Sequence, residues 1–245
     1  MLAVFKREFS SYFISPLGAI VISLYALLSG FFFWMMCFLS GYSYLSYVIN
    51  YMLNVVFFLI PLITMKSFSE EKRQRTDQAL LTAPVRLIEI VLGKFLSSFC
   101  LYFICNCVYF VYALVLIICA PEAVIDWGMF LLSWFGIILL GAALLAINIF
   151  YSSLTEYQII AAVIGLGTGL LLMLYDSVLS AVNNFINTLF STDYSFFVLD
   201  KLSLTAHYEN FTSGIFDPAD VVFFVSWVAL FLFLTLRGLD KKRWA

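Results

Sequence analysis

Residues 17–39 read LGAIVISLYALLSGFFFWMMCFL, a run that contains no Asp, Glu, Lys, Arg or His. A helix needs about 20 mostly apolar residues to cross the roughly 30 Å hydrocarbon core of a bilayer, and this run meets that length. It also exceeds the apolar core of about 7 to 15 residues in a secretory signal peptide, and no A-x-A-like cleavage site follows it. We therefore interpret residues 17–39 as an uncleaved first transmembrane span.

The rest of the chain has the same character, because 64% of its residues are hydrophobic and only 11% are charged. Soluble domains are about half apolar and about a quarter charged. Runs such as residues 130–140 are apolar almost all round, whereas barrel strands alternate apolar with polar positions. We therefore predict an all-α integral membrane protein, folded as one domain, with six transmembrane helices. The five further spans are predicted at about 47–65, 95–120, 128–150, 158–175 and 220–239.

The basic residues fix the expected orientation. All but Lys201 of the 13 Lys and Arg residues fall on one side of this threading, and half of that set lies between the second and third spans. Because basic residues near span ends concentrate in cytoplasmic loops, we expect this side, with both termini, to be cytoplasmic. The expected location is the bacterial inner membrane.

Two segments outside the spans read as membrane-associated helices. Residues 1–14 mix apolar side chains with Lys6, Arg7 and Glu8, which predicts an interfacial helix along the inner leaflet. Residues 176–219 hold apolar runs that are too short to span, which predicts an outer segment with re-entrant or interfacial helices.

Proline and capping residues mark the span ends. Ser15-Pro16 and Asp217-Pro218 each place a capping side chain before a proline in the first helical turn. Pro61 lies inside the second span, where it removes a backbone hydrogen bond and predicts a kink.

The loop between the second and third spans reads KSFSEEKRQRTDQALLTAPVRLIEIVLGK over residues 66–94. Ser67 and Glu70 have capping-box spacing, and Pro84 is a natural stop, so we predict a helix at about 67–83. Its charges pair at helical spacing, Glu70 with Arg73 and Glu71 with Arg75.

The second half of this helix carries Leu80 and Leu81. Such residues anchor a helix in a groove on a partner protein. The alternative is that they touch lipid or the base of the bundle.

Three stretches together resemble a known family. They are SFSEEKRQRTDQALLTAPV with VLGK at residues 67–85 and 91–94, FKREFSSYFISPLGA at 5–19, and LTAHYENFTSGIFDPADVVFF at 204–224. They resemble type-2 ABC transporter permeases, in particular the gliding-motility-associated and copper-enzyme-maturation group. The loop stretch resembles the coupling-helix region of these permeases.

The resemblance implies a permease that pairs with a second permease, identical or a sister chain, and docks a cytoplasmic ABC ATPase subunit that holds ATP and Mg. Two positions depart from the family pattern: Arg75 stands where a Gly usually precedes Thr76, and Gln78 where a Glu is common. These departures leave the identity of the ATPase open. The expected ATPase-docking residues are Glu70, Glu71, Arg73, Arg75, Thr76, Leu80 and Leu81.

The chain has no G-x-x-x-x-G-K-[ST] motif, so we expect no P-loop ATP site in it, no cofactor and no enzymatic activity of its own. Ala161, Gly165 and Gly169 recur every four residues and form a small-residue helix face. The resemblance suggests that this face helps form the permease dimer interface. Packing within the chain is the alternative.

We predict no metal site. All five Cys lie in or at the ends of spans, where thiols mostly act as small hydrophobes, and a Cu(I) path through Cys100 and Cys107 has little support. His207 is the only histidine, and its nearness to Glu209 favours surface chemistry over catalysis. The scarcity of charges within spans argues against a proton- or sodium-coupled carrier.

Two functions fit these observations. The first is the membrane subunit of an ATP-driven transporter that exports a substrate or passes mechanical work to the envelope. The second is a membrane scaffold or assembly factor that uses the same loop to hold a soluble partner without ATP-driven transport. A membrane-embedded enzyme falls behind both, since no acid, base and metal set converges. The substrate, and the choice between an identical and a sister partner chain, stay open at this point.

Overall fold

The computed structural model describes residues 1–39, 45–75, 86–119, 125–190 and 202–244, and these parts of the chain contain helices and no strand. Six helical stretches are long and apolar enough to cross a membrane, which confirms the predicted all-α fold with six spans. They run over Pro16–Leu39, Leu45–Arg73, Leu87–Cys119, Trp127–Leu154, Gln158–Tyr175 and Pro218–Lys241.

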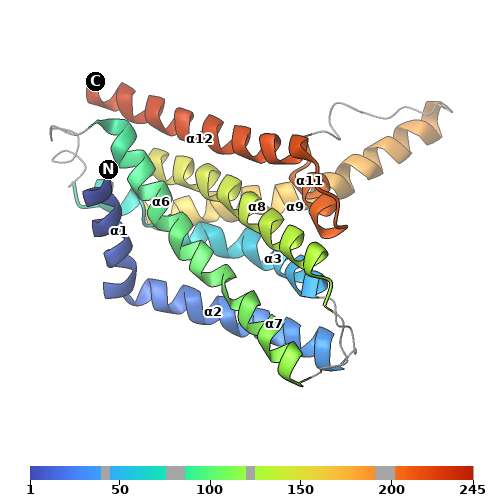
Figure 1. Ribbon diagram of the computed structural model, residues 1–245. Helices are drawn as coiled ribbons and strands as arrows, with labels where there is room; N and C mark the ends of the chain where they lie inside the picture. The colour runs from blue at the N-terminus through green and yellow to red at the C-terminus, as the bar shows by residue number, and fades with distance from the viewer. Residues whose placement is uncertain (40–44, 76–85, 120–124, 191–201, 245) are drawn as a thin grey trace.

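The spans form a bundle whose two chain ends lie at the same end (Figure 1). Helix α8 (Trp127–Leu154) occupies the centre and packs against α3 (Leu45–Thr64), α12 (Pro218–Trp244) and α9 (Gln158–Phe190). The most apolar stretch of α8 is 67% buried, whereas those of α9 and α12 are each 22% buried. The outer helices therefore leave most of their apolar surface to the membrane or to partners.

Glycines let large side chains reach α8 from two sides. A Cβ at Gly141 would lie 2.2 Å from the ring of Tyr102, and one at Gly136 would lie 2.7 Å from Phe211 Cβ. Tyr102 also donates a hydrogen bond of 2.8 Å to the Ile137 carbonyl. These contacts seat α6 (Leu87–Asn106) and α11 (Leu204–Thr212) directly on the backbone of α8.

The predicted small-residue face of α9 lies against α3 and α8 of the same chain. A Cβ at Gly165 would lie 2.0 Å from Asn148 Oδ1, and one at Gly169 would lie 3.0 Å from the Phe57 carbonyl oxygen. Ala161, Gly165 and Gly169 are all buried by this packing. This placement matches the alternative of packing within the chain and does not support a dimer interface through these three residues.

Two helices extend beyond the predicted limits. Helix α6 begins at Leu87 rather than near residue 95, so Lys94 lies within it, and α7 (Val108–Cys119) continues the span after a turn at Cys107. Helix α9 runs without a break to Phe190 and projects beyond the bundle (Figure 1). A separate re-entrant helix beginning near residue 178 is therefore not what the structure shows. The reason is local, since no Gly or Pro follows Gly169 before Phe190.

The predicted caps are partly confirmed. Asp217 Oδ1 accepts a hydrogen bond of 2.9 Å from the Ala219 amide at the start of α12. Ser15 precedes Pro16 at the start of α2 (Pro16–Phe33) as expected, but its side chain makes no capping hydrogen bond. The first turn of α2 therefore keeps amides without a side-chain cap.

Candidate functional site

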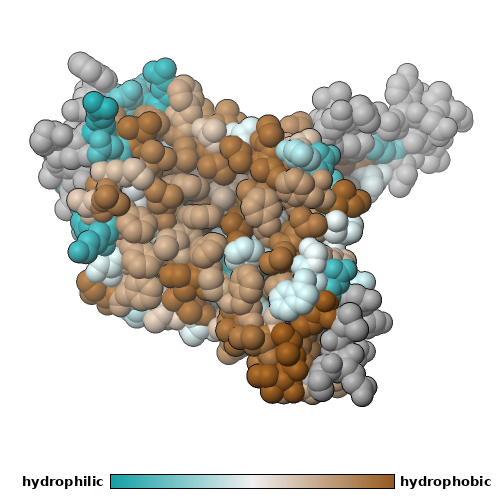
Figure 2. All heavy atoms as spheres, viewed as in Figure 1, coloured by the Kyte–Doolittle hydropathy of each residue, from teal (hydrophilic) through white to brown (hydrophobic). Residues whose placement is uncertain are grey.

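Four helices meet at the end of the bundle that holds both chain ends. They are α1 (Leu2–Ile14), α4 (Ser69–Arg73), the first turns of α6 and the last turn of α8, and we call this region the α4 end. Figure 2 shows hydrophilic side chains gathered at this end, beside the broad apolar surface of the spans. Because all Lys and Arg residues except Lys201 fall on this side of the threading, the α4 end is where the positive charge of the chain concentrates.

Helix α4 is held by the end of α8. Ser152 Oγ accepts hydrogen bonds from the amides of Phe68 at 3.0 Å and Ser69 at 3.3 Å. Ser69 Oγ lies 3.0 Å from Ser152 Oγ, and the buried Lys72 Nζ donates to the Ser153 carbonyl. A side chain from another span thus supplies the N-terminal cap.

The predicted capping box is therefore wrong. The N-cap of α4 is Phe68, which makes no side-chain cap bond, and Ser67 lies one residue too early for the role. Its carbonyl instead accepts a hydrogen bond of 2.5 Å from Lys94 Nζ. The cap on α4 comes from a residue more than 80 positions away, which local spacing could not indicate.

Lys94 is the centre of the charge arrangement, with only 1% of its side chain exposed. Its Nζ lies 3.0 Å from Glu71 Oε2 and 3.2 Å from Glu8 Oε1. It also sits 4.9 Å from the centroid of the Phe68 ring. A buried ammonium is tolerated when several acceptors surround it, and here they come from α1, α4 and the turn before α4.

Arg7 completes the cluster from the surface side. Its Nη2 lies 2.6 Å from Glu71 Oε1 and 2.7 Å from Glu8 Oε1. The hydrogen bond that Arg7 donates to Glu8, together with the charges of the Glu8 and Glu71 carboxylates, raises the pKa of Arg7 above its ordinary value. We call these four residues, Arg7, Glu8, Glu71 and Lys94, the ionic node. Its two cations and two anions join α1, α4 and α6.

Helix α1 is docked on the bundle by further contacts. A Cβ at Gly93 would lie 3.0 Å from Val4 Cγ1, so α1 approaches α6 closely. The buried Tyr12 Oη donates to the Ile63 carbonyl at 3.1 Å and lies 3.0 Å from Ser98 Oγ. Burial raises the pKa of Tyr12 to about 12. The predicted helix at residues 1–14 is confirmed, and one of its faces packs on protein.

The predicted docking residues separate into two groups. Arg73 and Arg75 are exposed, and Glu70 is partly exposed, with Lys66 Nζ at 3.4 Å and Gln74 Nε2 at 3.3 Å. Glu71 is turned inward into the ionic node. Thr76, Leu80 and Leu81 lie outside the described residues. The predicted pairs were Glu70 with Arg73 and Glu71 with Arg75. The structure instead places Glu70 against Lys66 and Gln74, and Glu71 in the ionic node.

Arg75 interrupts the helix predicted over residues 67–83. Helix α4 ends at Arg73, and Arg75 has a φ of 57°. This left-handed conformation costs an L residue with a side chain about 1–2 kcal/mol, whereas Gly adopts it freely. The family resemblance noted in the sequence implies Gly at this position, and the backbone conformation would give a physical reason for that preference.

The opposite end of the bundle carries a smaller polar cluster. His207 Nδ1 lies 2.5 Å from Asp220 Oδ1, and Asn210 Nδ2 donates to Asp220 Oδ2 at 2.9 Å. The His207 ring stacks on Phe223 at 4.0 Å. The expected surface pairing of His207 with Glu209 is thus replaced by a contact with a buried carboxylate. Within the described ranges, no three His, Cys, Asp or Glu side chains gather as a metal site would require.

Sequence reasoning missed Arg7, Glu8, Lys94 and Ser152 as members of the site. The one available signal was Lys94 itself, which interrupts the apolar run IVLGKFL and therefore needs acceptors if the helix starts before it. Nothing in the sequence says which carboxylates supply them.

The six apolar helices and the charges gathered at one end define a multi-pass α-helical membrane protein. The chain belongs to the ABC-2 family transporter proteins, whose family model matches residues 32–244. No curated protein matches the chain. The predicted type-2 ABC permease is thereby confirmed: the chain is a membrane subunit and not itself catalytic, and such permeases usually work with a cytoplasmic ATPase subunit.

Proposed function

We propose that this protein couples ATP hydrolysis by a cytoplasmic ATPase subunit to export, or to mechanical work on the envelope as in the gliding-motility group. The α4 end faces the cytoplasm of a bacterial inner membrane, in agreement with the distribution of basic residues. The partner subunit holds ATP and Mg. A second permease, identical or a sister chain, completes the transporter.

The observation that carries this proposal is the attachment of α4 to three other helices. The ionic node ties α4 to α1 and α6, and Ser152 ties it to α8. A force applied to α4 therefore reaches two membrane spans and the N-terminal helix at once. Such an attachment suits a segment that passes motion from a partner into the bundle.

The docking surface lies on the outer side of this attachment. Glu70, Arg73 and Arg75 are exposed enough to contact a partner, and the segment that follows supplies Thr76, Leu80 and Leu81. Glu71 acts in transmission rather than in docking, since both of its oxygens face cations of its own chain.

The second permease contacts a face other than Ala161, Gly165 and Gly169, because Ala161 is buried and α3 and α8 cover the two glycines. If the fifth span takes part, it does so through its exposed face, on which Val163 is 61% and Leu171 70% exposed.

The test is a pull-down of the tagged full chain, in mild detergent, with the products of neighbouring genes. We expect recovery of a vanadate-sensitive ATPase, and loss of that recovery when Leu80→Asp and Leu81→Asp are combined. The matched control is Tyr157→Asp, an exposed apolar-to-acidic change outside the loop, which should leave recovery intact. Recovery of a partner without ATPase activity would contradict the proposal and favour the scaffold.

A further inference from the structure

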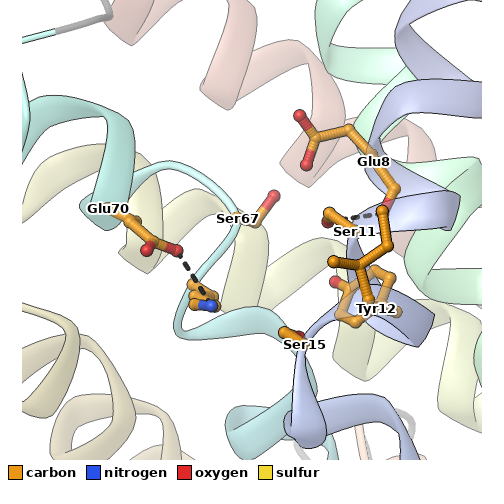
Figure 3. Close-up of a pocket in the computed structure, with 8 residues that line it drawn as sticks. Glu8, Ser11, Tyr12, Ser15, Ser67 and Glu70 are labelled. Atoms are coloured by element: carbon orange, nitrogen blue, oxygen red, sulfur yellow. Dashed lines mark hydrogen bonds and ion pairs between the residues drawn. The ribbon is translucent and has the colours of Figure 1, made fainter.

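A cavity of about 310 Å³ opens at the corner between α1 and the turn that follows α3. Its polar lining comes from Glu8, Ser11, Ser15, Lys66, Ser67 and Glu70 (Figure 3). An apolar groove of about 390 Å³ begins at the same corner, because Ser15 and Lys66 line both. The groove runs between Leu17, Ile20 and Leu24 of α2 and Leu59, Leu62 and Met65 at the end of α3. A polar chamber thus continues into an apolar channel.

The corner between them is suited to a phosphate group. Helix α2 starts here without a side-chain cap, and since Pro16 has no amide hydrogen, its first turn offers an anion only the amides of Leu17 and Gly18. Gly18 is buried against the Tyr12 carbonyl oxygen, so the phosphate depends mainly on side chains. Lys66 adds a cation that is one-third exposed. Among the described residues, the hydroxyls of Ser15 and Ser67 make no hydrogen bond, so both can donate to a ligand in the cavity.

A carboxylate stands beside this phosphate position. Glu70 Oε2 lies 3.4 Å from Lys66 Nζ, and the Glu70 side chain is 31% exposed. Glu8, the other acid of the cavity, already faces Arg7 and Lys94. Glu70 also contacts Lys66 and Gln74, but its side chain is 31% exposed against 15% for Glu8, so it is the acid with room to accept hydrogen bonds from a ligand ammonium while Lys66 faces the phosphate. The two charges match a zwitterionic headgroup in sign and order.

We propose that this corner binds a membrane phospholipid whose headgroup carries a primary ammonium, such as phosphatidylethanolamine. The phosphate lies at the α2 N-terminus and Lys66, the ammonium points to Glu70, and one acyl chain follows the α2–α3 groove. The groove is open to lipid, since Ile20 is 60% and Leu24 39% exposed and both α2 and α3 belong to membrane spans. The inference rests on those spans and not on the ATPase partner.

The bound lipid would add a further link between parts of the chain that meet at this corner. Its headgroup touches the end of α1, the start of α2 and the turn that leads into α4. Membrane composition would thereby influence how firmly the turn before α4 is held.

The experiment uses the full chain in nanodiscs containing equal amounts of phosphatidylethanolamine, phosphatidylcholine and phosphatidylglycerol. Native mass spectrometry counts the lipids that stay bound after release. We expect one retained phosphatidylethanolamine per chain, because the trimethylated headgroup of phosphatidylcholine cannot donate to Glu70 and phosphatidylglycerol lacks the ammonium. Lys66→Gln should lower retention by about tenfold, as loss of a charge-assisted hydrogen bond predicts. The matched control Lys6→Gln, an exposed lysine of α1 outside the cavity, should retain lipid as the unaltered chain does.

A second variant tests the groove separately from the headgroup chamber. Leu24→Trp fills the groove without removing any polar contact and should also reduce retention. Equal retention of the three lipids, or retention unchanged in both Lys66→Gln and Leu24→Trp, would overturn the proposal. A dimer that dissociates on Leu24→Trp without any retained lipid would overturn it too, since a second chain would then be the occupant of the groove. Each of these results is independent of whether an ATPase is recovered in the pull-down.

Discussion

The two ends of the bundle bury their charges in different ways. At the α4 end, Lys94 meets carboxylates that lie 86 and 23 positions away, on α1 and α4. At the opposite end, His207 meets Asp220 only 13 positions away, and the two helices concerned follow one another in the chain. The first arrangement joins elements from distant parts of the sequence, whereas the second fixes one local corner. The α4 end therefore connects more elements than the opposite end does, as the proposed transmission of motion requires.

The largest effect should come from Lys94→Met. This change leaves the largely buried carboxylates of Glu8 and Glu71 with Arg7 as their remaining cation in the ionic node. We expect a loss of about 3 kcal/mol in the free energy of unfolding, typical of removing one partner from a buried ion pair. Thermal unfolding of the detergent-solubilised chain measures it. Lys6→Met, an exposed change of the same type, should have almost no effect. Equal melting temperatures for the two variants would show that the ionic node does not stabilise this end of the bundle.

Ser152→Ala should cost about 1 to 2 kcal/mol, because it leaves the amides of Phe68 and Ser69 without their acceptor. The neighbouring Ser153→Ala is the matched control, since its hydroxyl bonds only to the Phe150 carbonyl of its own helix. Hydrogen exchange at the start of α4 should quicken in the first variant and not in the second. The same exchange rate in both would mean that α4 is not capped by α8.

Asp220→Asn tests the opposite end and should cost about 1 kcal/mol, because it weakens two hydrogen bonds without opening a cavity. The loss of stability should stay local: hydrogen exchange should become faster in α11 and should stay unchanged in α4. Asp217→Asn is the control, as Asn caps a helix about as well as Asp. Faster hydrogen exchange at the α4 end in Asp220→Asn would show that the contacts of Asp220 are not local to the opposite end of the bundle.

The smallest expected change has the opposite sign. Arg75→Gly should raise the free energy of unfolding by somewhat less than about 1 kcal/mol, because Gly adopts a φ of 57° without strain but gains entropy in the unfolded chain. Arg73→Gly, inside α4, should instead lower it by about 1 kcal/mol. The same sign of effect for both glycines would show that the left-handed turn does not control this segment.

The six spans could be predicted because each is long, apolar and nearly free of charge, so that local composition decides it. The limits of α6 and α9 could not, since hydropathy marks where a membrane ends rather than where a helix does. Lys94 illustrates the difference between the two limits. A basic residue beside an apolar run is expected to lie just outside a transmembrane helix, but here the helix starts seven residues earlier, at Leu87. Its burial depends on carboxylates brought in by the tertiary fold.

The predicted docking segment begins at the α4 end, where the structure gathers charged side chains, and its docking role stays a prediction. Glu70, Arg73 and Arg75 lie near the surface as a docking role requires. Glu71 has the same sequence signal as Glu70, and only the approach of Arg7 and Lys94 turns it inward. The small-residue face of α9 was predicted to help form the dimer interface, with packing within the chain as the alternative, because spacing alone does not say whether the neighbour is the same chain or another. In the structure Gly165 and Gly169 pack on α3 and α8.

Pro61 and Gly169 are connected through one backbone atom, the carbonyl oxygen of Phe57. Proline has no amide hydrogen to give the Phe57 carbonyl four residues before it, and Gly169 brings its backbone to that same oxygen. A side chain at position 169 would press on a carbonyl that proline has left exposed. The two positions therefore form a compensating pair, in which replacing Pro61 by alanine would restore the helical bond and relax the demand for glycine on α9. Substitutions at these sites are expected to be tolerated together more readily than one at a time.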